Sequence, residues 1–281
     1  MRTQNEQNLI NQFCLYHPTT LEDLKALCND KSVCLGDIDT SSITDMSHLF
    51  EKSKRRNFSG IENWDVSNVE LMNYTFSEAK HFNADISSWN TKSLRRMDYI
   101  FYRCIRFNSD LSKWDVSKVQ SMKYAFSHAV AFNKPLNDWK VLNVVNMAGM
   151  FYQAYAFNQP LNHWNVSSVL SMRAMFSSAL KFNQDLDEWK VDKKVDKYAM
   201  FAMALKYRQY LKQWNLSEDD GFMMFLKTPD YKTTVIEKTI RGCFKGIFLY
   251  HIKSMLLIEK LFKVQKNTSA FSFGGIFNLN V

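Results

Sequence analysis

The chain has 281 residues and a formal net charge of +8, and 46% of its residues are hydrophobic and 15% aromatic. This composition supplies a large core and is too apolar for an intrinsically disordered chain. The 8 glycines and 4 prolines are few for a turn-rich all-β barrel, and the five cysteines form no Cys-x-x-Cys pair, which argues against a disulfide framework or a zinc site.

Residues 1–34 precede the repetitive part of the chain. They contain no apolar run typical of a secretory signal peptide and no lipidation motif. Thr20 and Asp23, followed by Leu24, Leu27 and Cys28, have the pattern of an N-capped helix. We expect this segment to form a helical N-terminal cap that covers the open end of the first repeat.

Residues 35–216 contain a repeat with a period of 25 residues, which indicates stacked structural units. Its clearest mark is a column of tryptophans: Trp64, Trp89, Trp114, Trp139, Trp164, Trp189 and Trp214. The first unit has Ile38 in the tryptophan position, and the step from Ile38 to Trp64 is 26 residues, so one extra residue lies near 54–56. An asparagine column is expected to satisfy backbone groups at the turns between units. It comprises Asn83, Asn108, Asn133, Asn158 and Asn183.

The spacing inside one unit predicts its local structure. In residues 111–116, Leu-x-x-Trp-x-Val places the tryptophan and the valine on one side of a short extended segment. The apolar residues that follow step by three and four residues, as on one or two helical turns: Val119, Met122, Phe126, Ala129 and Phe132. Ser117 and Gln120 have the form of a capping box. The sequence therefore predicts an α/β solenoid of about eight 25-residue coils, each with a short strand and a short helix.

The segment Phe157–Trp189, FNQPLNHWNVSSVLSMRAMFSSALKFNQDLDEW, resembles the 25-residue repeat of the BspA-like leucine-rich-repeat surface proteins. That repeat is also described as a mycoplasma lipoprotein repeat of unknown function. The resemblance implies a leucine-rich-repeat-like solenoid, bacterial surface or secreted localisation, adhesion or other binding to host or partner proteins, no enzymatic activity and no cofactor. Two features depart from it: the chain has neither signal peptide nor lipobox, and residues 217–281 do not look like the repeat.

Residues 217–281 form a divergent tail in which apolar residues recur at helical spacing between Thr234 and Lys266. This pattern predicts an amphipathic helix, and no apolar run reaches the ~18 residues that a transmembrane helix needs. A helix that covers the last coil is the preferred interpretation. A basic amphipathic helix on a membrane surface and a shifted reading frame are the alternatives.

The candidate binding face consists of the residues on either side of each tryptophan, which we expect to be exposed on neighbouring strands about 5 Å apart. Its residues are Lys113, Asp115, Asp138, Lys140, His163, Asn165, Glu188 and Lys190. Pairing of Lys113 with Asp138, and of Asp115 with Lys140, is the structural alternative. A separate basic patch consists of Arg95, Arg96, Arg103 and Arg106.

Three functions remain open after this reading. The first is a monomeric, non-enzymatic protein-interaction or adhesion module with a protein ligand. The second is an intracellular scaffold or an effector exported without a signal peptide. The third is an anion or nucleic-acid binder that uses the basic patch, although no nucleic-acid motif accompanies that patch. The scattered histidines predict no metal site.

Overall fold

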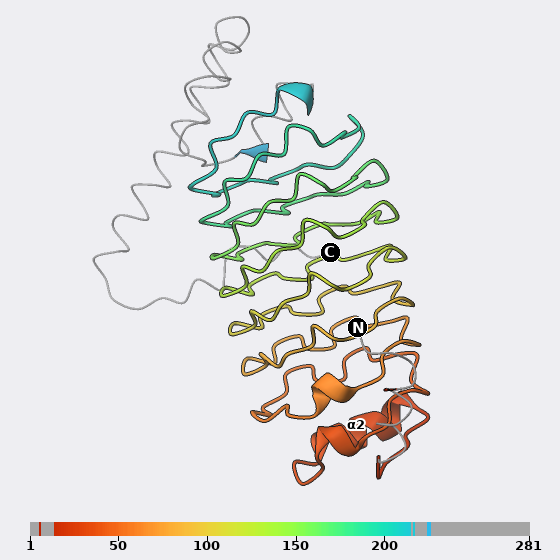
Figure 1. The fold of residues 1–281 in the computed structure, drawn as a ribbon. Helices are drawn as coiled ribbons and strands as arrows, with labels where there is room; N and C mark the ends of the chain where they lie inside the picture. Colours follow the sequence, from red (N-terminus) through yellow and green to blue (C-terminus); the bar gives the residue numbers. More distant parts are fainter. Residues whose placement is uncertain (1–5, 7–13, 215, 217–223, 226–281) are drawn as a thin grey trace, which may run out of the picture. The chain divides into compact units, whose positions relative to one another are not determined.

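The computed structural model describes residue 6, residues 14–214, residue 216 and residues 224–225. The chain divides into two units, Met1–Tyr231 and Lys232–Val281, and the second lies outside the described residues. The predicted amphipathic helix of the tail therefore falls on residues that the structure does not describe. Within the first unit, the chain winds into a stack of coils that lie one above another (Figure 1).

The expected strand and helix in every coil are wrong. The described residues contain one α-helix, α2 (Leu21–Asn29), and three short 3-10 helices. These are η1 (Leu35–Asp37), η2 (Ile61–Asn63) and η3 (Lys212–Trp214). In the described ranges, β-pairing consists of isolated parallel bridges and no sheet forms. The protein is therefore not an α/β leucine-rich-repeat solenoid, and its coils are built almost entirely from turns.

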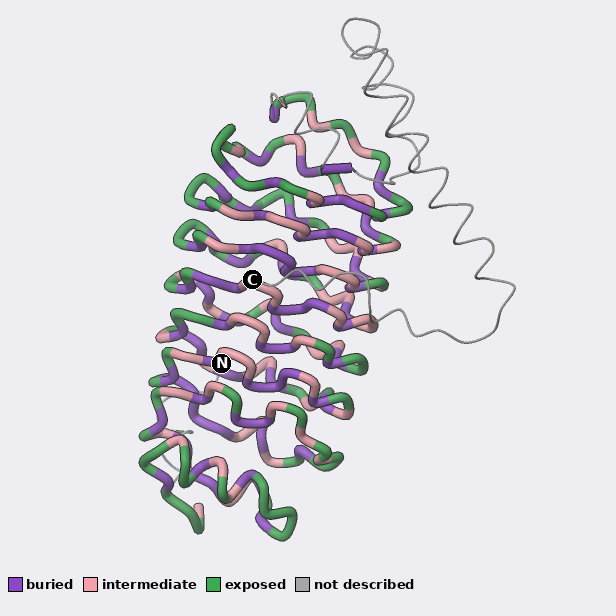
Figure 2. The backbone as a smooth tube through the Cα atoms, turned by 180° about the vertical axis from the view of Figure 1, so that it is seen from behind, coloured by how far each residue is buried: buried purple, intermediate pink, exposed green. Residues whose placement is uncertain are grey.

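Three corner turns shape each coil, and each is closed by a backbone hydrogen bond between residues three apart. In one coil, the amide of Trp114 bonds to the carbonyl of Leu111 (3.0 Å), and that of Val119 to Val116 (2.9 Å). The amide of Phe132 bonds to Ala129 (3.0 Å). We call these turns the Leu–Trp, Val–Val and Ala–Phe corners. In each, the two outer residues point into the core and the two tip residues face outward, which is why exposed residues follow the turns in Figure 2.

The side of the coil between the Val–Val and Ala–Phe corners was expected to be helical and is not. Tyr74 and Glu78 have φ of 56° and 58°, in the left-handed region that ends an α-helix. Backbone amides along this side alternate in their partners: that of Ser77 bonds to Tyr74 in its own coil (3.0 Å), and that of Phe76 bonds to Ile100 in the next (2.9 Å). Half of the amides therefore close turns, and the other half join the coils.

The capping box predicted at Ser117 is also replaced by a turn, and the equivalent Ser67 has the same geometry. The amide of Ser117 donates to Oδ1 of Asp115 at 2.9 Å, and that of Ser67 donates to Oδ1 of Asp65 at 2.9 Å. An aspartate two residues before the bonded amide makes an Asx turn, which leads the chain into the Val–Val corner instead of starting a helix.

Parallel bridges connect each coil to the next at the residue just before the methionine that recurs in successive coils, as Met122 does in one of them. They run Asp45↔Leu71, Leu71↔Arg96, Arg96↔Ser121, Ser121↔Asn146, Asn146↔Ser171 and Ser171↔Asp196. The one strand-like position of the coil is thus seven residues after the tryptophan and not beside it.

The core consists of stacked columns of side chains. Trp139 is 2% exposed, and its Nε1 donates to the carbonyl of Leu111 in the preceding coil at 2.9 Å. Its ring lies parallel to that of Trp164, with centroids 6.5 Å apart. Two columns of phenylalanines, which repeat Phe126 and Phe132 every 25 residues, also stack on each other, as Phe151 does on Phe157 at 3.9 Å. Each tryptophan therefore fills the core and bonds the backbone of its neighbour.

The asparagine column has the structural role expected from the sequence. Oδ1 of each asparagine accepts a hydrogen bond from the backbone amide 25 residues later, at 2.8–2.9 Å. The last acceptor, Asn183, receives the amide of Arg208. The ladder joins successive coils at the return that follows the Ala–Phe corner.

The ends of the stack carry different elements. Helix α2 begins at the predicted N-cap, where the Thr20 hydroxyl accepts from the amide of Asp23 at 3.1 Å, and it buries Leu24 and Cys28. The capped helix predicted here is confirmed. Near the other end, Phe225 stacks on Phe201 with centroids 5.3 Å apart, which extends the Phe column. The domain divisions at 34/35 and 216/217 stay predictions.

Candidate functional site: the corners of the stack

The first half of the predicted binding face lies at the tips of the Leu–Trp corner. Lys113, Asp138, His163 and Glu188 each occupy the second tip position, and all four are exposed. His163 Nδ1 lies 3.5 Å from Oδ1 of Asp138 in the coil before. These residues do line up along the stack as expected, but on turns and not on strands.

The second half of that face is partly structural. Oδ1 of Asp115 and of Asn165 accept the amides of Ser117 and Ser167, so both side chains shape the next corner. Lys140 and Lys190 are exposed. The two lysine–aspartate pairs expected along this face are not among the ion pairs of the described residues.

The predicted basic patch is divided between two corners. Arg95 and Arg96 follow the Val–Val corner, whereas Arg103 and Arg106 lie at the Ala–Phe corner. Arg95 Nε contacts Glu70 Oε2 at 3.1 Å, and Arg103 Nη1 lies 3.9 Å from Glu78 Oε2, in both cases on the coil before. The sequence placed four arginines together, but the structure pairs two of them with carboxylates 25 residues earlier. This distribution argues against the hypothesis that the four arginines form a single anion-binding patch.

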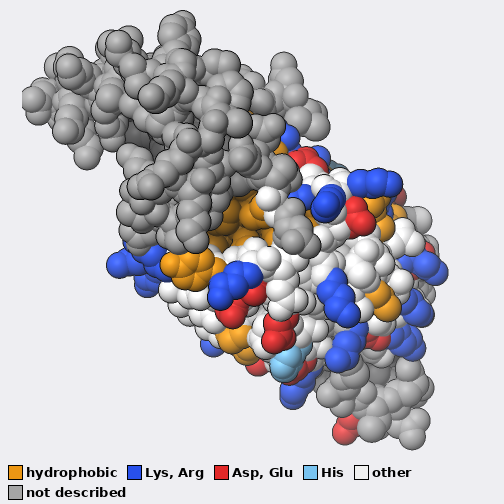
Figure 3. Space-filling view, turned by 90° about the horizontal axis from the view of Figure 1, so that it is seen from above, with side chains coloured by type: hydrophobic (Ala, Val, Ile, Leu, Met, Phe, Trp, Pro, Cys, Tyr) orange, Lys and Arg blue, Asp and Glu red, His pale blue; other side chains and the backbone are white. Residues whose placement is uncertain are grey.

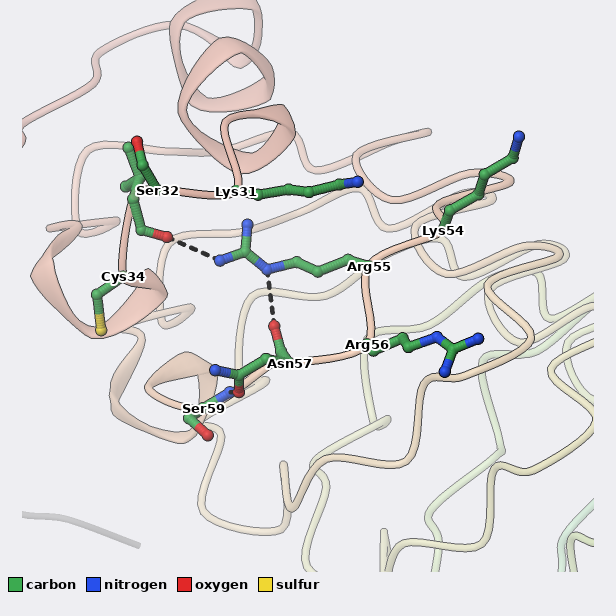
Figure 4. A pocket seen from close by; sticks show the side chains of 9 residues that line it. Lys31, Ser32, Cys34, Lys54, Arg55, Arg56, Asn57 and Ser59 are labelled. Carbon is green, nitrogen blue, oxygen red and sulfur yellow. Dashed lines mark hydrogen bonds between the residues drawn. The ribbon is translucent and has the colours of Figure 1, made fainter.

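A hollow of about 440 Å³ lies beside the C-terminal end of helix α2. Its lining comes from the loop after the helix and from the segment that holds the extra residue of the first coil (Figure 4). Arg55 crosses it and donates to the carbonyls of Cys28 (3.0 Å) and Val33 (2.7 Å), while its Nε donates to Asn57 (2.7 Å). Arg55 therefore fastens the helix to the first coil, and Figure 4 shows Lys54 and Arg56 extending away from it.

An aromatic ladder runs along the side of the first coils. The rings of His48 and Tyr74 stack at 4.7 Å, Tyr74 and Tyr99 at 4.6 Å, and Tyr99 and Tyr124 at 5.0 Å. Burial raises the pKa of each of the three phenols. The ring faces are covered by one another, so the ladder offers edges and neutral hydroxyls, not a platform for a stacking ligand.

Sequence reasoning missed an exposed apolar column at the Ala–Phe corner. The first tip residue there is apolar in five successive coils: Ile105, Val130, Tyr155, Leu180 and Leu205. Three of them have large exposed fractions, 42% for Ile105, 39% for Tyr155 and 43% for Leu205. We call these five residues the apolar ridge. The signal was present in the 25-residue register, but the helical interpretation hid the turn tips.

Metal binding and thiol nucleophilicity would depend on the His, Cys, Asp and Glu side chains of the described residues. The described residues include no group of three or more His, Cys, Asp or Glu side chains that could hold a metal ion. Cys28, Cys34 and Cys104 are free thiols, and burial raises the pKa of Cys28 to about 12. Among the described helices, none is long and apolar enough to cross a membrane.

The geometry defines a repeat protein, a stack of turn-built coils held together by side-chain and backbone ladders. Residues 20–139 and 121–238 match the family model DUF285, described as a Mycoplasma protein of unknown function. The chain belongs to this family. The mycoplasma part of the resemblance is thereby confirmed, while the BspA-like part is not. No curated protein and no solved structure matches the chain.

Proposed function

We propose that the chain is a non-enzymatic protein-interaction module that binds its ligand along the Ala–Phe corner, and that it serves in adhesion where it is displayed at a cell surface. The single observation that carries this proposal is the apolar ridge. Corner tips elsewhere in the stack are mostly polar, as expected for exposed turns. An aligned row of apolar tips gains free energy only when a partner covers it.

The surroundings of the ionisable groups support a binding role over an enzymatic one. The shifted pKa values of Tyr99, Cys104 and Tyr207 arise mainly from burial in the columns that hold the coils together. Their shifts keep protons on the groups and so disfavour nucleophilic or basic roles. Two arginines of the predicted basic patch contact glutamates, which reduces the positive charge available to a polyanion and so favours a protein ligand.

Site-specific photo-crosslinking tests the proposal. A photoreactive amino acid replaces Tyr155 on the ridge or, as the matched control, His163 on the Leu–Trp corner, which is also exposed. We expect discrete adducts from position 155, identified by mass spectrometry, and none of the same mass from position 163. Leu180→Asp with Leu205→Asp should remove the adduct. Equal labelling from both positions, or none from 155, would contradict a ligand at the ridge.

Adhesion needs a test of location as well as binding. Protease treatment of intact source cells should release peptides from residues 64–216 while cytosolic marker proteins stay intact. Repeats that remain protected until lysis would replace adhesion with the intracellular scaffold as the setting of the same interaction.

A further inference from the structure

We infer that the partner of the apolar ridge is an amphipathic α-helix with acidic flanks, which lies along the stack. This inference rests on the proposed function and names the kind of ligand for the same corner. It follows from three features of the ridge: the spacing of its side chains, the charge beside them and their depth.

The spacing of the ridge fits a helix. Parallel bridges join neighbouring coils, so equivalent backbone positions lie ~4.8 Å apart, while stacked rings one coil apart range from 4.6 Å for Tyr74 and Tyr99 to 6.5 Å for Trp139 and Trp164. The five ridge residues are separated by four intervals of ~4.8 Å, so the ridge is about 19 Å long. Four pitches of an α-helix, at ~5.4 Å each, are about 22 Å long. An extended strand repeats the same face every ~6.8 Å and would reach about 27 Å. Over the length of the ridge, the side chains of a helix therefore drift by about 3 Å from the ridge residues, whereas those of a strand drift by about 8 Å.

Basic residues beside the ridge favour a ligand that has acidic residues next to its apolar stripe. The second tip position is basic toward both ends, with Arg106, Lys181 and Lys206, and small in the middle, with Ala131 and Ala156. The small residues leave the central part of the ridge accessible to a neighbouring backbone. Figure 3 shows lysine and arginine side chains interspersed with aspartate and glutamate on the visible end of the stack.

At the position before the corner, Arg103 is the one lysine or arginine of the ridge coils, and the other residues are His128, Gln153, Ser178 and Met203. Arg103 is exposed there, and Glu78 on the coil before lies 3.9 Å from its guanidinium group. A ligand with carboxylates beside its apolar stripe would meet the unlike charges of Arg106, Lys181 and Lys206, whereas a basic ligand would meet like charges. A second copy of this chain would also place its basic flanks against these, which disfavours self-association through the ridge.

The depth of the ridge favours a protein over a lipid surface. More than half of each of the side chains of Ile105, Tyr155 and Leu205 is already covered by the stack. Side chains that are covered to this extent present a shallow, single-file row, which can interdigitate with the ridges of a helix. Membrane binding requires an apolar face buried ~5–10 Å into the headgroup and acyl boundary. The half-covered side chains of the ridge do not extend far enough from the stack to insert to this depth.

Fluorescence anisotropy with the full chain tests the inference. The probe is a labelled synthetic helical peptide that carries one leucine per turn with glutamates on both sides. Control peptides carry lysines in place of the glutamates, alternate leucine and glutamate as a strand, or contain a mid-helix proline. We expect binding of the glutamate helix alone, weakened by salt. Tyr155→Ser with Leu180→Ser should weaken it about tenfold or more, which corresponds to ~1.4 kcal/mol. His163→Ser should leave it unchanged.

Each other outcome overturns the inference in a distinct way. Equal binding of the lysine helix contradicts the charge argument, and better binding of the alternating peptide contradicts the helix. Binding to phosphatidylserine vesicles that is lost in the ridge variant indicates a membrane, and a dimer that Leu180→Asp dissociates in gel filtration indicates a second copy. Absence of peptide binding together with an adduct at position 155 would remove this inference and leave the proposed function intact. Absence of both would remove both.

Discussion

Removal of Trp139 tests the column model most directly. This side chain is 2% exposed at mid-stack, its ring is parallel to that of Trp164, and its Nε1 bonds to the carbonyl of Leu111. Trp139→Ala should lower the free energy of unfolding by ~3–5 kcal/mol, the usual cost of truncating a buried aromatic residue. Loss of the indole hydrogen bond contributes about 1 kcal/mol of this cost, because the Leu111 carbonyl still accepts the amide of Trp114 at 3.0 Å.

Two matched variants separate the contributions. Trp139→Phe keeps most of the apolar ring but removes the indole N–H, so it should cost about 1 kcal/mol, mostly for the lost hydrogen bond to Leu111. His163→Ala changes an exposed tip residue and should stay within ~0.5 kcal/mol of the parent chain. Urea denaturation followed by far-ultraviolet circular dichroism gives the three values.

The position of Trp139 in the stack adds a second readout. Coils stabilise one another through nearest-neighbour interfaces, so a defect at mid-stack should loosen the adjoining coils before the ends. Limited proteolysis of Trp139→Ala should therefore cut first at corner turns near this residue. An unfolding midpoint equal to that of the parent chain would refute the buried column. Equal costs for the alanine and phenylalanine variants would refute the cavity contribution.

Three further predictions concern other columns. Gly149→Ala should cost ~1–3 kcal/mol in urea denaturation, since a Cβ there would lie 2.1 Å from the ring of Tyr124, and Tyr124→Ala should rescue part of the loss. Burial, with a smaller effect of Arg103, lowers the pKa of His128 to about 4; its NMR resonances should not titrate between pH 5 and 8. Stability should fall as the pH drops from about 6.5 through about 4, where the unfolded chain binds the extra proton, and His128→Gln should reduce that fall. Asn158→Ala removes the acceptor for the next coil's amide and should cost about 1 kcal/mol, whereas Asn158→Asp keeps an acceptor and should cost less, as urea midpoints will show.

Stacking, register and core were predictable from the sequence because a 25-residue period places equivalent residues above one another. The tryptophan column, the asparagine ladder and the N-cap at Thr20 follow from residue type and spacing alone. The local structure was not predictable in the same way. Apolar residues three apart, such as Ala129 and Phe132, mark one helical turn or the two outer residues of a β-turn equally well. The apolar ridge was missed for the same reason, since its members are the tips of those turns.

The coils are built from turns although the chain has few glycines, and the reason is physical. Thirteen described residues other than glycine have positive φ, among them Tyr74 and Glu78 of a single coil. A left-handed backbone costs a residue with a Cβ ~1–2 kcal/mol. The same side of that coil donates four amides to the next coil, and each hydrogen bond contributes about 1 kcal/mol. The compensation exists only when a neighbouring coil is present, so the turn conformation belongs to the stack and not to the isolated sequence of one repeat.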